Sequence, residues 1–197
     1  VGAQLLLTHH PIIFRPIKSL IADNVTASRA IAAYQSGISV ISLHTRLDIG
    51  NGGVNDALAS RIGLGDIECF GDSETPTLGR IGSISEMTLA EFAETVKNAL
   101  GAVSVSFVGN LPVRRVAVVG GDGNDFISAA KVAGADTIVT GEARYNMSID
   151  MAESGINVVV AGHYFTEQPV CNVLSSLAKN IAGADVILYE SNTIKSL

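Results

Sequence analysis

The sequence predicts an α/β fold in which mostly parallel sheets are flanked by helices. Short β-branched or leucine-rich runs alternate along the chain with segments of helical spacing, and this alternation is typical of parallel sheets covered by helices. The 197 residues are 47% hydrophobic, with a mean hydropathy of +0.37. Such a chain can bury a substantial core, in one domain or in two closely packed lobes.

Six runs are predicted as strands, because each is short, apolar and bounded by glycine or polar residues. They are QLLLT (residues 4–8), ISVISL (38–43), RRVAVVG (114–120), DTIVTG (136–141), INVVVAG (156–162) and DVILYE (185–190).

Three segments between these runs are predicted as helices, at residues 24–37, 52–65 and 87–101. The first two end near Gly37 and Gly63, since glycine commonly follows the last helical turn. The third carries an apolar stripe and a possible capping box between Thr88 and Glu91.

The stretch from Gly65 to Pro112 interrupts the alternation and is rich in glycine, serine and threonine at its start. We therefore expect two lobes, at about residues 1–64 and 112–197, joined by an intervening segment at 65–111. The chain also begins at Val1, within the approach to a predicted strand, so an N-terminal portion is expected to be missing.

Composition and charge disfavour several classes of protein. The net charge is −6, the sequence pI is about 5.1, and lysine and arginine form no cluster, so nucleic acid is a disfavoured partner. Cys69 and Cys171 are far apart, which indicates neither a disulfide framework nor a zinc ribbon and fits a reducing cytoplasm. No apolar run approaches the roughly 20 residues of a membrane span.

The four histidines share one kind of position. His9 and His10 follow QLLLT, His44 follows ISVISL, and His163 follows INVVVAG. Ligands of open α/β sheets bind beyond the carboxyl ends of the strands. All four histidines are therefore candidates for one binding site.

Carboxylates accompany two of these histidines. Asp48 comes four residues after His44, and Glu167 comes four residues after His163, a spacing that shares one face of a helix. Imidazole and carboxylate donors together suit Zn, Mn, Fe, Co or Ni. Adjacent imidazoles in an extended chain point to opposite sides, so the His9–His10 pair suggests two metals, each taking one ring.

Three further features have more than one interpretation. His44 could bind metal, hold Asp48 in place or shuttle a proton, and the latter roles are favoured. Glu142 could line the same cleft or cap the following helix. The turn VVGGDGNDF at residues 118–126 lacks a Walker lysine, so a strand-to-helix connection capped by Asn124 or Asp125 is favoured over a phosphate site.

Several motifs together resemble one known family. THHPIIF, HTRLDIGNGGVNDALASRIGL, GRIG, VVGGDGNDFISAA, GADTIVTGEARY and GINVVVAGHYFTE occur in order from residue 3 to about residue 178. They resemble the dinuclear metal centre family of GTP cyclohydrolase I type 2 homologues, the Nif3-like proteins. The resemblance implies a two-lobed Nif3-like fold, a metal pair at the lobe interface and a toroidal homohexamer.

Carried over by motif, the resemblance implies that His9, His10, Asp48, His163 and Glu167 are the metal ligands, with Glu167 or Asp48 bridging the two ions. The chain departs from the family in lacking the usual strand and helix before the paired histidines. Asn146 also stands where many members have His, and Arg46 where many have Asn. These departures bear on the substrate more than on the metals.

Paired divalent metals in a cleft most often serve hydrolysis. The sequence therefore predicts a dinuclear metal-dependent hydrolase acting on a small nucleotide-like or phosphorylated metabolite, with His44 as proton shuttle and Glu142 orienting water or substrate. The alternative is a non-enzymatic metal-binding protein or a ring-forming regulatory scaffold. A closed coordination sphere would favour the scaffold, and an exchangeable site facing a pocket would favour the enzyme.

Overall fold

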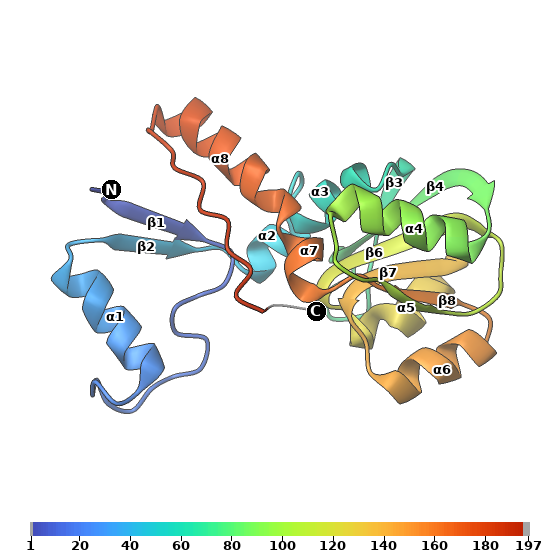
Figure 1. Cartoon of the computed structure of the whole chain (residues 1–197), viewed down its shortest axis with the longest axis horizontal. Coiled ribbons are helices and arrows are strands. Elements are labelled where there is room, and N and C mark those ends of the chain that lie inside the picture. The colour runs from blue at the N-terminus through green and yellow to red at the C-terminus, as the bar shows by residue number, and fades with distance from the viewer. Residues whose placement is uncertain (1, 195–197) are drawn as a thin grey trace. The chain divides into compact units, whose positions relative to one another are not determined.

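The structure is a computed structural model that describes residues 2–194 (Figure 1). The chain forms two compact units, Val1–Leu47 and Asp48–Leu197. The lobe boundaries expected near residues 64 and 112 remain a prediction.

The first unit is a βαβ unit. β1 (Leu5–Thr8) and β2 (Ser39–Ser42) pair in parallel, and α1 (Val25–Gln35) connects them. The helix begins after Asn24, whose side chain accepts a hydrogen bond from the backbone N–H of Ala27. The unit therefore confirms the two strands and the helix predicted from residues 4–43.

The second unit is built on a six-stranded sheet in the order β3-β4-β6-β7-β8-β5. β6, β7 and β8 pair in parallel, whereas the other three pairings are antiparallel. The α/β class is confirmed and the parallel character is partial. The strands are β3 (Gly65–Phe70), β4 (Gly79–Met87), β5 (Ser106–Val108), β6 (Val113–Asp122), β7 (Thr137–Glu142) and β8 (Asn157–Val160).

Helices cover both faces of this sheet, which Figure 1 shows with α4 on one side and α5 and α6 on the other. Along β6, Val116 and Val118 pack in a core with Phe92, while Ala117 and Val119 pack in a second core with Ile127. The central strands read as continuous apolar runs because neither face meets water. The remaining helices are α2 (Thr45–Ile49), α3 (Val54–Arg61), α4 (Leu89–Leu100), the 3-10 turn Asn124–Phe126, α5 (Ile127–Val132), α6 (Tyr145–Glu153), α7 (His163–Glu167) and α8 (Pro169–Ala182).

The start of α4 confirms the predicted capping box. The Glu91 backbone N–H donates to Thr88 Oγ1 at 3.3 Å, and the Thr88 backbone N–H donates to the Glu91 carboxylate at 2.9 Å. The predicted apolar stripe is buried at Leu89, Phe92 and Val96. These caps satisfy two backbone donors that the first turn leaves without helical partners.

Two strand predictions need correction. Residues 185–190 form no strand: Ile187 is 67% exposed and Tyr189 84% exposed, and a strand needs a neighbouring strand that takes its backbone hydrogen bonds. Conversely, β3, β4 and β5 lie between residues 65 and 112, where the sequence predicts a helix at 87–101 but no strand. β4 begins with Gly79 and the charged Arg80, which weakens its apolar signal.

Candidate metal centre

The histidines lie where the sequence predicts them. His9 and His10 follow β1, His44 follows β2, and His163 follows β8, each within three residues of the strand's end. The first three belong to the first unit and His163 belongs to the second.

The three histidines of the first unit form one cluster. One ring nitrogen from each of His9, His10 and His44 lies within 4.8 Å of the others. The ring centroids are 4.9 Å apart for His9 and His10, 5.4 Å for His9 and His44, and 5.6 Å for His10 and His44. This spacing could hold a metal ion.

The expectation that the adjacent imidazoles point to opposite sides is wrong. β1 ends at Thr8, and residues 9 and 10 form a bend, so the alternation of an extended strand no longer applies. The Thr8 hydroxyl donates to the carbonyl of His10 at 2.8 Å, and the backbone N–H of His44 donates to the carbonyl of His9 at 2.9 Å. These bonds stabilise the bend that brings the rings together.

His44 has an uncommon backbone conformation, with φ of 40°. A side chain other than glycine pays about 1–3 kcal/mol in this sparsely populated region, and such residues concentrate at functional sites. The Phe14 ring packs edge-on against the imidazole, with centroids 5.4 Å apart. The surrounding contacts therefore hold a strained residue in the histidine cluster.

In the second unit, His163 and Glu167 share one face of α7. His163 Nε2 lies 3.1 Å from Glu167 Oε1, as the four-residue spacing predicts. On the other side of the ring, Nδ1 lies 2.7 Å from Glu142 Oε1. Histidines that bind metal commonly hold their second nitrogen in this way, which fixes the tautomer and the ring orientation.

The two interpretations of Glu142 can now be separated. Glu142 is the last residue of β7 and its carboxylate contacts His163. The N-cap of α6 is Arg144, and no side chain caps this helix. Glu142 therefore contacts the His163 ring and does not cap α6.

The predicted cap at Asn124 or Asp125 is wrong. α5 has Phe126 at its N-cap, without a side-chain cap hydrogen bond. Asn124 is buried, and its side-chain oxygen accepts from the backbone N–H of Arg144. A 3-10 turn occupies the predicted cap position, and Asn124 ties it to the start of α6.

One glycine in β6 and one in β7 make room for His163 and Glu167. A Cβ on Gly121, which has φ of 66°, would lie 2.4 Å from Glu167 Oε1 and 3.1 Å from His163 Nε2. A Cβ on Gly141 would lie 2.7 Å from the Cα of His163. At Gly141 the clash would be with backbone, and at Gly121 the Glu167 carboxylate would have to move, so glycine lets the backbone of β6 and β7 approach α7 closely.

The charges around His163 favour its protonated form. The hydrogen bond to Glu167 raises the pKa of His163 to about 9, with a smaller contribution from Glu142, while partial burial opposes both. Two carboxylates flanking one imidazole attract a cation. In the metal-free protein this cation is the proton on the imidazole, and a metal ion can replace that proton.

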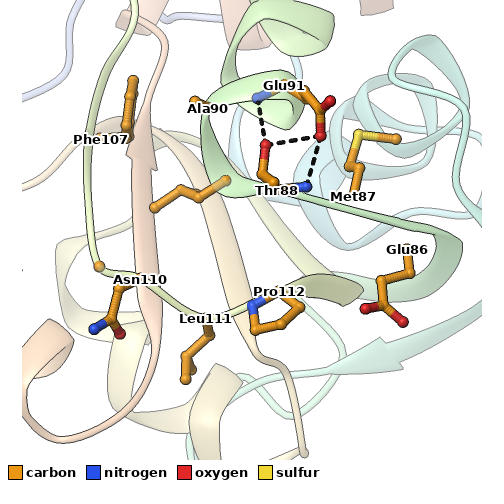
Figure 2. A pocket seen from close by; sticks show the side chains of 11 residues that line it. Glu86, Met87, Thr88, Ala90, Glu91, Phe107, Asn110, Leu111 and Pro112 are labelled. Atoms are coloured by element: carbon orange, nitrogen blue, oxygen red, sulfur yellow. Dashed lines mark hydrogen bonds between the residues drawn. The ribbon is translucent and has the colours of Figure 1, made fainter.

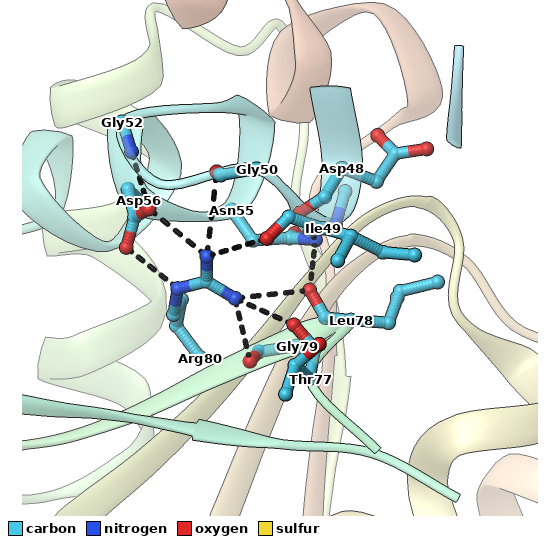
Figure 3. A network of polar contacts seen from close by, with 11 residues as sticks. Asp48, Ile49, Gly50, Gly52, Asn55, Asp56, Thr77, Leu78, Gly79 and Arg80 are labelled. Atoms are coloured by element: carbon cyan, nitrogen blue, oxygen red, sulfur yellow. Dashed lines mark hydrogen bonds and ion pairs between the residues drawn. The ribbon is translucent and has the colours of Figure 1, made fainter. Parts of the chain in front are cut away.

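Asp48 belongs to α2 and begins the second unit. Its backbone carbonyl accepts a hydrogen bond from Asn55 Nδ2 at 3.3 Å, next to the buried Arg80 (Figure 3). Sequence reasoning missed Asn55 and Arg80. The available signal was a charged residue inside the apolar run GRIGSI, where an unpaired charge would be costly.

These residues fit a transition metal. The cluster of the first unit offers three imidazoles, and the second unit offers His163 with Glu167. Zinc, manganese, iron, cobalt and nickel all accept such nitrogen and oxygen donors.

A cavity of about 570 Å³ lies elsewhere in the second unit (Figure 2). It is lined by residues around the end of β4 and the approach to β6, including Met87, Phe107 and Pro112. The described lining includes none of the predicted site residues. β6 starts at Val113, beside the cavity, and its other end approaches His163. The cavity and His163 therefore lie at opposite ends of this strand.

Among the described residues, no helix is both long and apolar enough to cross a membrane.

Comparisons with known proteins give one consistent result. The model of the family described as Duf34/NIF3 (NGG1p interacting factor 3) matches residues 1–195. A Clostridium perfringens protein named GTP cyclohydrolase 1 type 2 homolog is 32% identical over 201 residues, which cover 99% of this chain and 77% of that protein.

Solved structures are similar as well. The hypothetical protein SA1388 of Staphylococcus aureus gives a TM-score of 0.86 at 26% identity, covering 98% of this chain and 80% of that chain. Reduced HcgD from Methanocaldococcus jannaschii gives a TM-score of 0.76 at 29% identity, covering 91% and 72%.

Proposed function

The chain belongs to the DUF34/NIF3 family, and from this membership and the two groups of donor side chains we propose that it is a hydrolase dependent on two divalent metal ions. The observation that carries the proposal is the cluster of His9, His10 and His44, whose ring nitrogens lie within 4.8 Å of one another. Neutral imidazole nitrogens are donors that first-row transition metals accept, and His9 and His10 offer two of them beside the ring of His44.

In this proposal the residues that would hold the metals are His9, His10, Asp48, His163 and Glu167. Two properties support the set. Its imidazole and carboxylate donors suit first-row transition metals. Because His163 Nδ1 contacts the accepting Glu142 carboxylate at 2.7 Å, Nε2, beside Glu167, is left as the nitrogen that would bind a metal.

Bound divalent ions would supply Lewis acidity and an activated water for hydrolysis. We assign His44 the transfer of a proton at its ring nitrogen, because its ring lies beside those of His9 and His10. We assign Glu142 the orientation of the His163 ring, and through it of water or substrate.

We propose a small nucleotide-like or phosphorylated metabolite as substrate. The support for a nucleotide is the name GTP cyclohydrolase 1 type 2 homolog carried by relatives such as that of C. perfringens. The negative net charge of −6 would repel an anionic substrate, so the metal ions themselves must supply the positive charge that binds it. We further propose a cytoplasmic location. We also propose assembly into a homohexameric ring, and light scattering of the purified protein measures the mass of the assembly.

Metal analysis followed by a hydrolysis screen tests the function. Wild-type protein should contain two transition-metal ions per chain and hydrolyse at least one compound in a panel of nucleotides and phosphoesters. The double variant His10→Ala with Glu167→Ala should lose both metals and the activity, whereas the exposed control Glu68→Ala should keep both. One metal or none in the wild type would contradict the paired site, and two metals without any hydrolysis would favour the non-enzymatic scaffold.

A further inference from the structure

Arg80 is an almost fully buried charge, 2% exposed, in a unit whose other buried side chains are mainly apolar. All five of its N–H donors can be accounted for. Nε and Nη2 form a fork on the Asp56 carboxylate at 2.6 and 3.0 Å. The other contacts are to backbone carbonyls on two separate segments (Figure 3): Thr77, Leu78 and Gly79 on one, Ile49 and Gly50 on the other.

The carbonyls of Ile49 and Gly50 lie at the carboxyl end of α2, directly after Asp48. Arg80 therefore joins the end of this helix to the start of β4. Asp56 strengthens the junction, because its second oxygen also accepts from the backbone N–H of Gly52 at 2.7 Å. Charge-assisted hydrogen bonds of this kind are about twice as strong as neutral ones.

Asn55 connects this junction to the part of β6 that lies beside His163. It is 1% exposed. Its Nδ2 donates to the carbonyls of Asp48 at 3.3 Å and Leu78 at 2.8 Å, and its Oδ1 accepts from the backbone N–H of Gly120 at 2.8 Å. Gly120 precedes Gly121, whose backbone lies against Glu167 and His163. One carboxamide thus connects the backbone of Asp48 to the strand that lies against the His163 site.

We infer that Asn55 and Arg80 are positioning residues, which hold the backbone of Asp48 in a fixed relation to His163 and Glu167 so that all three can serve as metal ligands. The inference rests on the proposed metal site. It assigns roles to two residues that do not themselves bind metal. A ligand carboxylate on an unrestrained helix end would lose conformational entropy when a metal binds. The network already restrains this helix end, so the loss on binding is smaller.

The chain offers a closely matched control for Asn55. Asn157 is 0% exposed, and its carboxamide also makes three hydrogen bonds: Nδ2 donates to the Leu111 carbonyl and Thr137 Oγ1, and Oδ1 accepts from the Leu111 backbone N–H. It stands at the first residue of β8, at the end of the strand away from His163. Changing either asparagine to aspartate keeps the shape of the side chain. At residue 55 both contacts to carbonyls become repulsive, and at residue 157 the contact to the Leu111 carbonyl does.

The experiment compares Asn55→Asp, Asn157→Asp and wild type by titration of the metal-free protein with Co²⁺, read from the visible absorption of the bound ion. Both variants should melt at lower temperatures than wild type. Only Asn55→Asp should bind Co²⁺ more weakly, by about 10- to 100-fold, and with an altered absorption band. Arg80→Lys should behave like Asn55→Asp, because an ammonium cannot span two backbone segments as the planar fork does.

Hydrogen exchange of the metal-free proteins supplies a second readout that needs no metal. Amides of residues 48–53 should exchange faster in Asn55→Asp than in wild type and remain unchanged in Asn157→Asp. Equal Co²⁺ affinity in the two asparagine variants would overturn the positioning role while leaving the proposed function intact. A wild-type protein that takes up no Co²⁺ would instead overturn the proposed function, and this inference with it.

Discussion

The imidazole of His163 is held between two carboxylates: Nδ1 lies 2.7 Å from Glu142 Oε1, and Nε2 lies 3.1 Å from Glu167 Oε1. The two acids come from different elements, β7 and α7. The ring orientation is therefore fixed from both sides within the second unit. This arrangement has consequences for metal affinity and for the pH dependence of stability.

Replacing Glu142 by glutamine should weaken metal binding without unfolding the protein. The amide keeps an oxygen near Nδ1 but loses the negative charge that makes the imidazole a better donor. Loss of such a partner typically costs about 10- to 100-fold in metal affinity. A Zn²⁺ competition titration measures the change, with Glu153→Gln at the end of α6 as the control. Unchanged affinity in Glu142→Gln would mean that His163 needs no support from β7.

The metal-free protein should lose stability as the pH rises from about 6.5 to about 9. The hydrogen bond to Glu167 raises the pKa of His163 from 6.5 to about 9. Because the folded protein holds this proton more tightly than the unfolded chain, the stabilisation is complete below pH 6.5 and disappears as the pH passes 9. NMR titration of the ring checks the pKa, and urea unfolding checks the stability.

The same titration has a built-in comparison. Glu167→Gln should lower the pKa of His163 more than Glu142→Gln does, because Glu167 is the larger contributor. The pH-dependent loss of stability should shrink in the same order. The reverse order would show that the contact through Nδ1 dominates.

Gly121→Ala should remove metal binding, whereas Gly101→Ala should not. Both glycines have positive φ, 66° and 64°, so each substitution should cost about 1–2 kcal/mol of backbone strain. A Cβ on Gly101 would meet nothing within 4 Å, but on Gly121 it would lie 2.4 Å from Glu167 Oε1. Metal content and thermal melting of the two variants separate strain from displacement of the ligand. Equal metal content would contradict the close approach of β6 to this carboxylate.

The elements that sequence reasoning identified have local causes. β1, β6, β7 and β8 are short apolar runs, and α4 carries its capping box within four consecutive residues, Thr88 to Glu91. The error at residues 185–190 arose because an apolar run does not reveal whether a partner strand is available. β4 was missed for the opposite reason, since its partners β3 and β6 support a sequence that includes Arg80.

The residues of the candidate site also differ in whether local sequence predicts them. Histidines at strand ends, and a carboxylate four residues after His163, follow from strand topology and helical spacing, so both could be predicted. Asn55 and Arg80 could not, because their roles depend on hydrogen bonds to partners as much as 65 residues away in the chain. The close pairing of His9 and His10 also depended on the bend that follows Thr8, which the predicted end of the strand did not reveal.

Thr88→Ala should destabilise the protein by about 0.5–2 kcal/mol, because the first turn of α4 loses its N-cap. The Thr88 side chain accepts from the Glu91 backbone and also bonds the Glu91 carboxylate. Thr88→Ser keeps the hydroxyl and should retain most of the stability. Chemical denaturation of the two variants gives the comparison. Metal content should be unchanged in both, because neither side of the capping box is a predicted ligand.

His44 combines a strained backbone with the proposed proton transfer, and two substitutions separate the two. Both His44→Gly and His44→Ala remove the ring and should lower hydrolysis by about 10²- to 10⁴-fold if the ring transfers a proton. Only glycine accepts the φ of 40° without strain, so the metal-free His44→Gly protein should be more stable than His44→Ala by about 1 kcal/mol. Denaturation curves measure this difference. Equal stability would mean that residue 44 relaxes once the ring is removed, and the positive φ would then be a consequence of the imidazole contacts with His9, His10 and Phe14.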